Sequence, residues 1–203
     1  MHALAPIARQ YYTDELPYHN FAHIEMTLRN ARTLIRRTQA ARLPIDIELV
    51  TISLLFHDAS YQVDSKFLGY PTKEHYSAHL ADVVLRDQGY SRSFRNKVTG
   101  CILATRIFSR AVTLEQKIVR LADASAGMDG SFANFMRSNK ALRWEWDYLY
   151  EPISTEQWRA QTNIVVSRYV RSKLTTARIK PALNAAFQKT VSYNLKQFLL
   201  MVD

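Results

Sequence analysis

The apolar residues of this chain recur at the spacing of an α-helix along nearly its whole length. From Phe21 to Ile35 they step by three or four residues, so they fall on one face of a helix expected over about residues 19–38. The chain has only five glycines and six prolines in 203 residues, too few for the many turns of a β-sandwich or barrel. The sequence therefore predicts an all-α fold of about eight or nine helices.

A second expected helix, from Ile47 to Phe56, is apolar on nearly every side, which predicts a buried helix at the centre of the fold. It is followed by a loop over about residues 59–72, where serine, aspartate, glycine and proline interrupt the apolar pattern. We expect Thr72 to cap the next helix, which carries Glu74 in its first turn. Further helix starts are indicated by Asn20, Asp46 and Ser91 and by capping boxes at Thr113–Gln116 and Ser154–Gln157.

No internal repeat and no low-complexity linker divides the chain, so residues 1–203 are expected to form one domain. The last expected helix covers about residues 179–200. A stretch before the C-terminal helices is rich in aromatic residues, which either belong to the core or form an exposed anchor patch on a protein-interaction module. Their type favours the core. These residues are Trp144, Trp146, Tyr148 and Tyr150.

The formal net charge is +9, and the excess of basic residues is concentrated in two segments. From Thr155 to the C-terminus, eight lysines and arginines stand against two acidic residues. The second segment, between Met26 and Leu43, contains no acidic residue. Such segments suit anionic ligands such as nucleotides or nucleic acid, and they equally suit a solvated face that keeps a protein soluble. The arginines of the second segment are Arg29, Arg32, Arg36, Arg37 and Arg42.

Cys101 is the only cysteine, which excludes an intrachain disulfide framework and a thiolate metal cluster and fits a reducing compartment. The N-terminal residues lack the long apolar run of a signal peptide. Nowhere do about 18 apolar residues follow one another, as a membrane-spanning helix requires. We therefore expect a cytoplasmic protein without a membrane span.

Three short motifs place histidine and aspartate on or at the ends of expected helices. His19 and His23 are four residues apart and lie on the same side of a helix. His57 and Asp58 close the most apolar helix, where an imidazole and a carboxylate are costly to bury unless they are paired or bind a metal. Asp123 ends another apolar segment. Each motif alone is most simply explained by packing or by pairing within the protein.

Taken together, His23, His57, Asp58 and Asp123 supply two imidazoles and two carboxylates from three helices. A mixed nitrogen and oxygen donor set of this kind suits a divalent ion such as Mn, Fe, Ni, Co, Zn or Mg. On an octahedral ion, four protein ligands would leave two positions for water and substrate. The set therefore predicts a metal centre between helices.

The order His, His-Asp, Asp on helices resembles the HD superfamily of metal-dependent phosphohydrolases. The flanking residues are also similar to small single-domain members of that family. The motif-bearing part covers roughly residues 18–128, whereas the basic C-terminal helices, 154–203, share only helical character and length. The resemblance implies a single HD-type helical domain with a metal site, and it says little about the substrate. The flanking motifs are Tyr18-His19-Asn20-x-x-His23-Ile24, Phe56-His57-Asp58-Ala59-x-Tyr61, Lys73-Glu74-x-x-Ser77-Ala78, Ile102-Leu103-Ala104-Thr105 and Leu121-Ala122-Asp123.

The resemblance makes His23, His57, Asp58 and Asp123 the ligands of one divalent metal ion. It places Glu74 where related proteins often carry an acidic residue beside the site. Glu74 is therefore the candidate for orienting the attacking water or protonating the leaving group, with Asp58 as the second candidate catalytic residue.

The sequence departs from the family pattern after Thr105, where relatives commonly have histidines and this chain has Arg106-Ile107-Phe108. This difference weakens the case for a second metal ion. Lys73 and Arg106 lie near the predicted site in the sequence and are candidates for holding a phosphate, although an ordinary surface position is the simpler explanation of each. Candidates for additional metal ligands are His19, His75 and His79.

A divalent ion held in this way lowers the pKa of a coordinated water and withdraws charge from a phosphoryl oxygen. We therefore expect a metal-dependent phosphohydrolase that acts on a small nucleotide or a related phosphorylated metabolite. The alternative is a nucleic-acid- or nucleotide-binding protein on an HD scaffold with a vestigial or structural metal site. Trp158, Tyr169 and Tyr193, which lie among the basic C-terminal residues, support that alternative. The sequence also leaves a homo-oligomer open.

Overall fold

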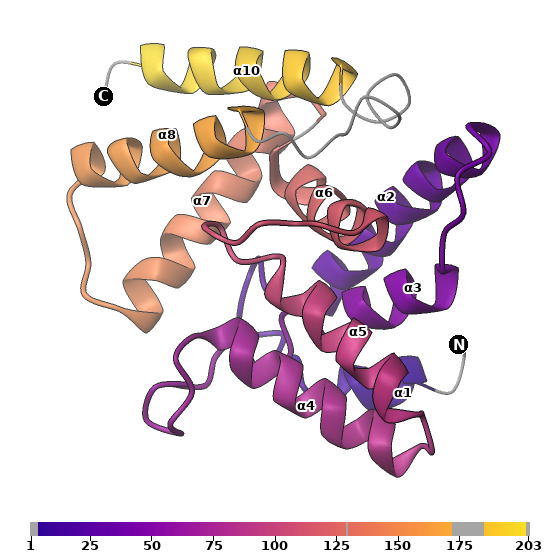
Figure 1. Ribbon diagram of the computed structural model, residues 1–203. Helices are drawn as coiled ribbons and strands as arrows, with labels where there is room; N and C mark the ends of the chain where they lie inside the picture. Colours follow the sequence, from indigo (N-terminus) through magenta and orange to yellow (C-terminus); the bar gives the residue numbers. More distant parts are fainter. Residues whose placement is uncertain (1–3, 129, 172–184, 202–203) are drawn as a thin grey trace.

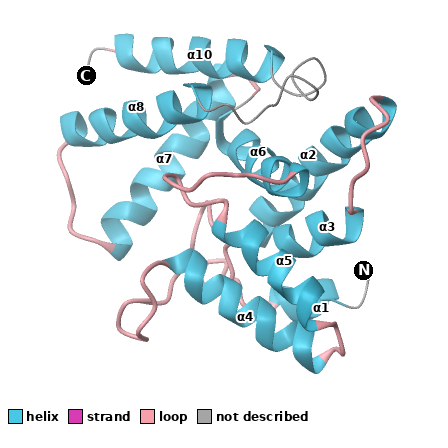
Figure 2. Cartoon of the chain, viewed as in Figure 1, coloured by secondary structure: helices cyan, strands magenta, loops and turns pink. Residues whose placement is uncertain are grey.

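The computed structural model describes residues 4–128, 130–171 and 185–201 (Figure 1). Within these ranges the chain forms α-helices and connecting loops and has no β-strand, which confirms the predicted all-α fold (Figure 2). None of the helices in these ranges is long and apolar enough to cross a membrane. The helices are α1 (Leu4–Arg9), α2 (Phe21–Ala40), α3 (Ile47–Phe56), α4 (Lys73–Asp87), α5 (Arg92–Leu103), α6 (Leu114–Met128), α7 (Phe132–Leu149), α8 (Thr155–Arg171) and α10 (Ala185–Leu200).

Helix α3 lies at the centre of the fold, where it contacts α1, α2, α4, α5 and α6. Val50, Ile52, Leu54 and Phe56 have no exposed surface, as the apolar character of all sides of this helix predicts. Burial of each such side chain contributes roughly 1.5–3 kcal/mol to folding. The central position of α3 fixes where its C-terminal end, and thus the His57-Asp58 motif, lies in the molecule.

Helix α2 packs along α6 and α3 through one buried face, which includes Ile24, Ala31 and Ile35, and it exposes its arginines on the other face. Helices α8 and α10 pack against each other, and α10 also contacts α6 and α7 (Figure 1). The predicted last helix begins at Ala185 among the described residues; its expected first part, 179–184, lies outside them.

The predicted caps at Asn20, Asp46 and Ser91 are confirmed, because each side chain accepts a hydrogen bond from a backbone N–H in the following turn. Both capping boxes are also formed. Thr72 differs from the prediction. It occupies the N-cap position of α4 without a side-chain cap bond, because its hydroxyl lies 3.0 Å from Nδ1 of His75 instead.

The expectation that the aromatic-rich stretch belongs to the core is wrong for most of its members. Trp144 is 49% exposed, and Tyr148 and Tyr150 are also exposed. Helix α7 contacts α6 and α10, so only part of its circumference is covered. Trp144 and Tyr148, one helical turn apart on the open side, cover each other by stacking with ring centroids 5.0 Å apart.

Candidate metal centre

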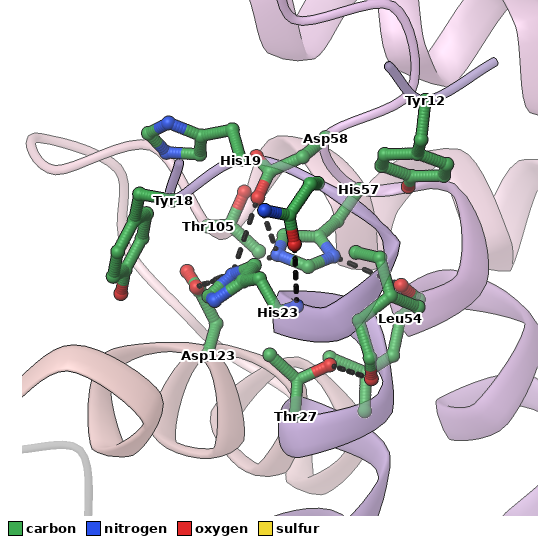
Figure 3. A network of polar contacts seen from close by, with 12 residues as sticks. Tyr12, Tyr18, His19, His23, Thr27, Leu54, His57, Asp58, Thr105 and Asp123 are labelled. Carbon is green, nitrogen blue, oxygen red and sulfur yellow. Dashed lines mark hydrogen bonds and ion pairs between the residues drawn. The ribbon is translucent and has the colours of Figure 1, made fainter. Parts of the chain in front are cut away.

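Three elements bring the four predicted ligands together (Figure 3). His23 lies in the first turn of α2, where the Asn20 side chain accepts hydrogen bonds from the backbone N–H groups of Ala22 and His23. His57 is the C-cap of α3, and Asp58 follows it in the turn. Asp123 comes from α6. The cap of α2 and the buried α3 thus position residues that are far apart in the sequence.

One donor atom from each of the four side chains lies within 4.8 Å of the others. The distances from the two imidazole Nε2 atoms to Oδ2 of Asp58 and Oδ1 of Asp123 lie between 2.9 and 3.4 Å. Neither Nε2 atom, although buried, makes a hydrogen bond of good geometry to any residue that the structure describes. The four side chains therefore point at a common centre, shared by two nitrogens and two oxygens.

The tautomer of His57 is set by the backbone. Its Nδ1 lies 2.9 Å from the carbonyl oxygen of Leu54, one turn earlier, and must donate a proton to it because a carbonyl only accepts. In the neutral ring, Nε2 then carries the lone pair and faces Asp58 and Asp123. Histidines that bind a metal through one ring nitrogen usually donate a hydrogen bond from the N–H of the other nitrogen to a carbonyl or carboxylate oxygen, as His57 does.

The two imidazoles and the two carboxylates stabilise each other's charged forms. Burial disfavours charge on all of them, but the attraction between imidazoles and carboxylates outweighs it. The pKa values of His23 and His57 are raised, and the pKa of Asp58 is lowered well below its usual range. Burial would raise the pKa of Asp123, yet the charge of His57 and the contacts with both imidazoles lower it to about 2. The carboxylates thus stay ionised, and a divalent cation would take the place of the imidazole protons.

The cluster opens into a pocket of about 290 Å³. The side chains of Asp58 and Asp123 retain 12% and 20% of their exposure and line this pocket, whereas the two histidines lie behind them. Glu74, from the first turn of α4, lines the same pocket. Gly127 on α6 is needed here, because a Cβ at this position would collide with the hydroxyl of Tyr18.

His19 lines the pocket but is not one of the four clustered residues. Its Nδ1 pairs with the carboxylate of Glu145, and its ring stacks on Tyr61 with centroids 3.5 Å apart. Glu145 is buried on α7 and also accepts the backbone N–H groups of Tyr18 and His19. Sequence reasoning missed Glu145, because a single glutamate in an aromatic-rich helix carries no local signal of a partner 126 residues away.

The other predicted residues lie outside the cluster. Lys73 donates a hydrogen bond to the carbonyl oxygen of Tyr61 and lies over its ring, and burial lowers the pKa of Lys73 to about 8. His75 contacts Thr72, and His79 packs beside Tyr70.

Neither Lys73 nor Arg106 is among the described residues that line the pocket, although Thr105 and Ile107, which flank Arg106, both are. Part of the basic C-terminal segment, including Lys173, Arg178 and Lys180, lies outside the described residues.

The donor set fits a divalent metal ion. It offers two ionised carboxylates and two imidazole nitrogens without a hydrogen bond of good geometry to the part of the chain that the structure describes, and it lies at the wall of a pocket. His23, His57, Asp58 and Asp123 could therefore hold such an ion. No family model, no curated protein and no solved structure matches this chain.

Proposed function

We propose that this protein is a metal-dependent phosphohydrolase of the HD type that acts on a small nucleotide or a related phosphorylated metabolite. The observation that carries the proposal is the convergence of His23, His57, Asp58 and Asp123 on one centre at the wall of a pocket. A purely structural cluster would leave the Nε2 atoms hydrogen-bonded, whereas both lack a partner of good geometry among the described residues.

The residues around the pocket have separate roles in this proposal. When bound, a divalent ion supplies Lewis-acid chemistry toward water and a phosphoryl oxygen. Glu74 faces the same space and orients the attacking water or gives a proton to the leaving group. Leu54 fixes the tautomer of His57, and Glu145 fixes the position of His19 beside the substrate.

The proposal is tested by metal analysis joined to a phosphate-release screen over phosphorylated metabolites, with and without added Mn²⁺. We expect about one divalent ion per chain, from the single complete donor set, and phosphate release that depends on it. Asp58→Asn should lose both while keeping its helical content by circular dichroism. His79→Asn, at an exposed histidine outside the cluster, is the matched control and should keep both. Metal retained by Asp58→Asn would contradict the assigned ligands.

Nucleic-acid binding is the second candidate function. It is favoured by a surface hollow on α2 that is lined by Arg29, Arg32 and Arg36. Binding through these arginines would weaken steeply with salt, because each phosphate contact releases counterions. A salt titration of the affinity for single-stranded and double-stranded oligonucleotides distinguishes the two candidates, since phosphate release at the metal centre does not require this face.

A further inference from the structure

The pocket that Asp58 and Asp123 line extends to helices α7 and α8, and its composition there limits what the substrate can be. Its volume of about 290 Å³ lies at the lower end for small-molecule sites, which excludes a polymeric substrate inside it. The inference that follows rests on the proposed function, because it names the substrate class of the same site.

The walls from α7 and α8 are largely apolar and aromatic. The rings of Trp146 and Trp158 have centroids 6.4 Å apart and are tilted by 58°. The Trp158 ring is held in place, since its Nε1 donates to Oδ1 of Asn139, whose Nδ2 in turn donates to Oγ1 of Thr162. Fixed aromatic faces of this kind bind planar groups by stacking, and the amide of Gln161, which also lines the pocket, offers hydrogen bonds to the edge of a ring.

The charged residues of the pocket wall point to a single phosphoryl group. Its acidic residues are Asp58, Glu74 and Asp123, and no lysine or arginine is among the described residues that line it. This is unexpected in a chain of net charge +9. A di- or triphosphate would bring further negative charge close to these carboxylates, with only one divalent ion to offset it.

We infer that the substrate is a phosphate monoester whose organic group carries a planar aromatic ring system, with the phosphate at the metal centre and the ring beside Trp146 and Trp158. In its hydrolysis the oxygen of water bonds to phosphorus, the ester P–O bond breaks, and a proton passes to the oxygen of the released alcohol. The products are inorganic phosphate and the alcohol that carries the ring, and besides water no oxidant, reductant or further substrate is needed.

The first test compares adenosine monophosphate, its di- and triphosphate, and ribose 5-phosphate as substrates of the full chain with Mn²⁺. We expect kcat/KM for the monophosphate to exceed that for each of the other three by roughly tenfold or more, as stacking and charge both require. Equal or faster hydrolysis of the triphosphate or of ribose 5-phosphate would overturn the inference, while phosphate release from any of them would still support the proposed function.

The second test measures binding without turnover, by calorimetric titration of the Mn²⁺-loaded protein with non-hydrolysable phosphonate analogues of adenosine mono- and triphosphate. Trp158→Ala should weaken binding by roughly tenfold and Trp158→Phe, which keeps an aromatic ring, by less. Trp144→Ala, an exposed tryptophan of α7 that does not line the pocket, is the matched control and should bind as the unchanged chain does.

Thermal melting of each variant separates loss of binding from loss of folding. Binding in the absence of phosphate release would support the pocket's ligand class and contradict the proposed hydrolysis. Binding that is equal for folded Trp158→Ala and Trp144→Ala, or tighter for the triphosphate than for the monophosphate, would overturn the inference.

Discussion

His23 and His57 are the two candidate ligands whose protonation competes with a metal ion. Burial disfavours their charged form, but the contacts with Asp58 and Asp123 raise the pKa of both imidazoles. The pKa values of the two carboxylates are lowered, so these stay ionised over the same range of pH. At any pH below a raised histidine pKa, a metal ion must displace a proton from that ring before it can bind.

Metal affinity should therefore fall on acidification. Between about pH 8 and about pH 6 we expect the affinity to fall, because both histidine pKa values are raised, and the loss approaches tenfold per pH unit for each proton displaced once the pH is below those values. Calorimetric titration with Mn²⁺ measures the affinity, and repeating it in buffers of different ionisation enthalpy counts the protons released. An affinity that is constant across this range would mean that the imidazoles are not ligands.

Replacing Glu74 tests catalysis independently of metal binding, because Glu74 is not one of the candidate metal ligands. A carboxylate in the first turn of α4 stabilises the helix by ~0.3–1 kcal/mol, which alone would explain its presence. If it also transfers a proton, Glu74→Gln should keep the metal and the fold and lower phosphate release by roughly 10²–10⁴-fold. Turnover and melting temperature are measured on the same preparation. Turnover within about twofold of the unchanged protein, too small an effect for a lost acid–base group, would restrict Glu74 to a role in helix stability.

Glu145 is a buried carboxylate that holds the turn before α2. It accepts two backbone N–H groups and pairs with His19, so its replacement leaves these donors without a partner. Glu145→Ala should lower the free energy of unfolding by about 2–4 kcal/mol, measured by urea denaturation. Glu151→Ala, at an exposed glutamate just beyond the same helix, is the control and should change it by less than about 0.5 kcal/mol. Equal effects would show that the Glu145 bonds do not stabilise the fold.

At the scale of elements, α2 ends in a Schellman motif that lacks the usual glycine. The N–H of Leu43 bonds to the carbonyl oxygen of Thr38, and that of Arg42 bonds to Gln39. Arg42 therefore has a φ of 55°, in the left-handed region that disfavours residues with a Cβ.

Arg42→Gly should raise the free energy of unfolding by about 1 kcal/mol, because glycine adopts this conformation without steric cost. The same substitution inside the helix, Arg37→Gly, should lower it by about 1 kcal/mol. Denaturant unfolding of both variants measures whether each substitution raises or lowers the free energy of unfolding. A loss of stability in Arg42→Gly would mean that the arginine side chain contributes more than the strained backbone costs.

The sequence predicts these elements well where the signal is local. Apolar spacing predicts α2 and the burial of α3, and side-chain chemistry predicts the caps at Asn20 and Asp46. It fails where a contact competes with the local rule. The hydroxyl of Thr72 contacts the side chain of His75 rather than a backbone N–H of α4. The spacing of residues in the sequence does not predict which of these two contacts forms.

At the scale of the molecule, the candidate ligands are predictable because each belongs to a short motif of unusual chemistry, and the clustered donor atoms agree with that prediction. The pocket is not predictable in the same way. Its walls come from α4, α6, α7 and α8 and from the segments before α2, after α3 and after α5, and their arrangement depends on packing over long sequence separations. The exposure of Trp144 and Tyr148 could not be predicted from the sequence for the same reason. Which face of α7 is covered depends on how that helix packs against the others.

Because α2, α6 and the end of α3 all contribute ligands, a bound ion should stabilise the whole fold rather than one element. An ion that binds only the folded chain at about 100 times its dissociation constant adds ~2.7 kcal/mol to the free energy of unfolding. For a chain of this length, that corresponds to a rise of roughly 5–10 °C in melting temperature. Far-UV circular dichroism with Mn²⁺, and again after a chelator, measures the rise and its reversal. Asp58→Asn should show neither and His79→Asn should show both, so an equal rise in the two variants would place the ion elsewhere.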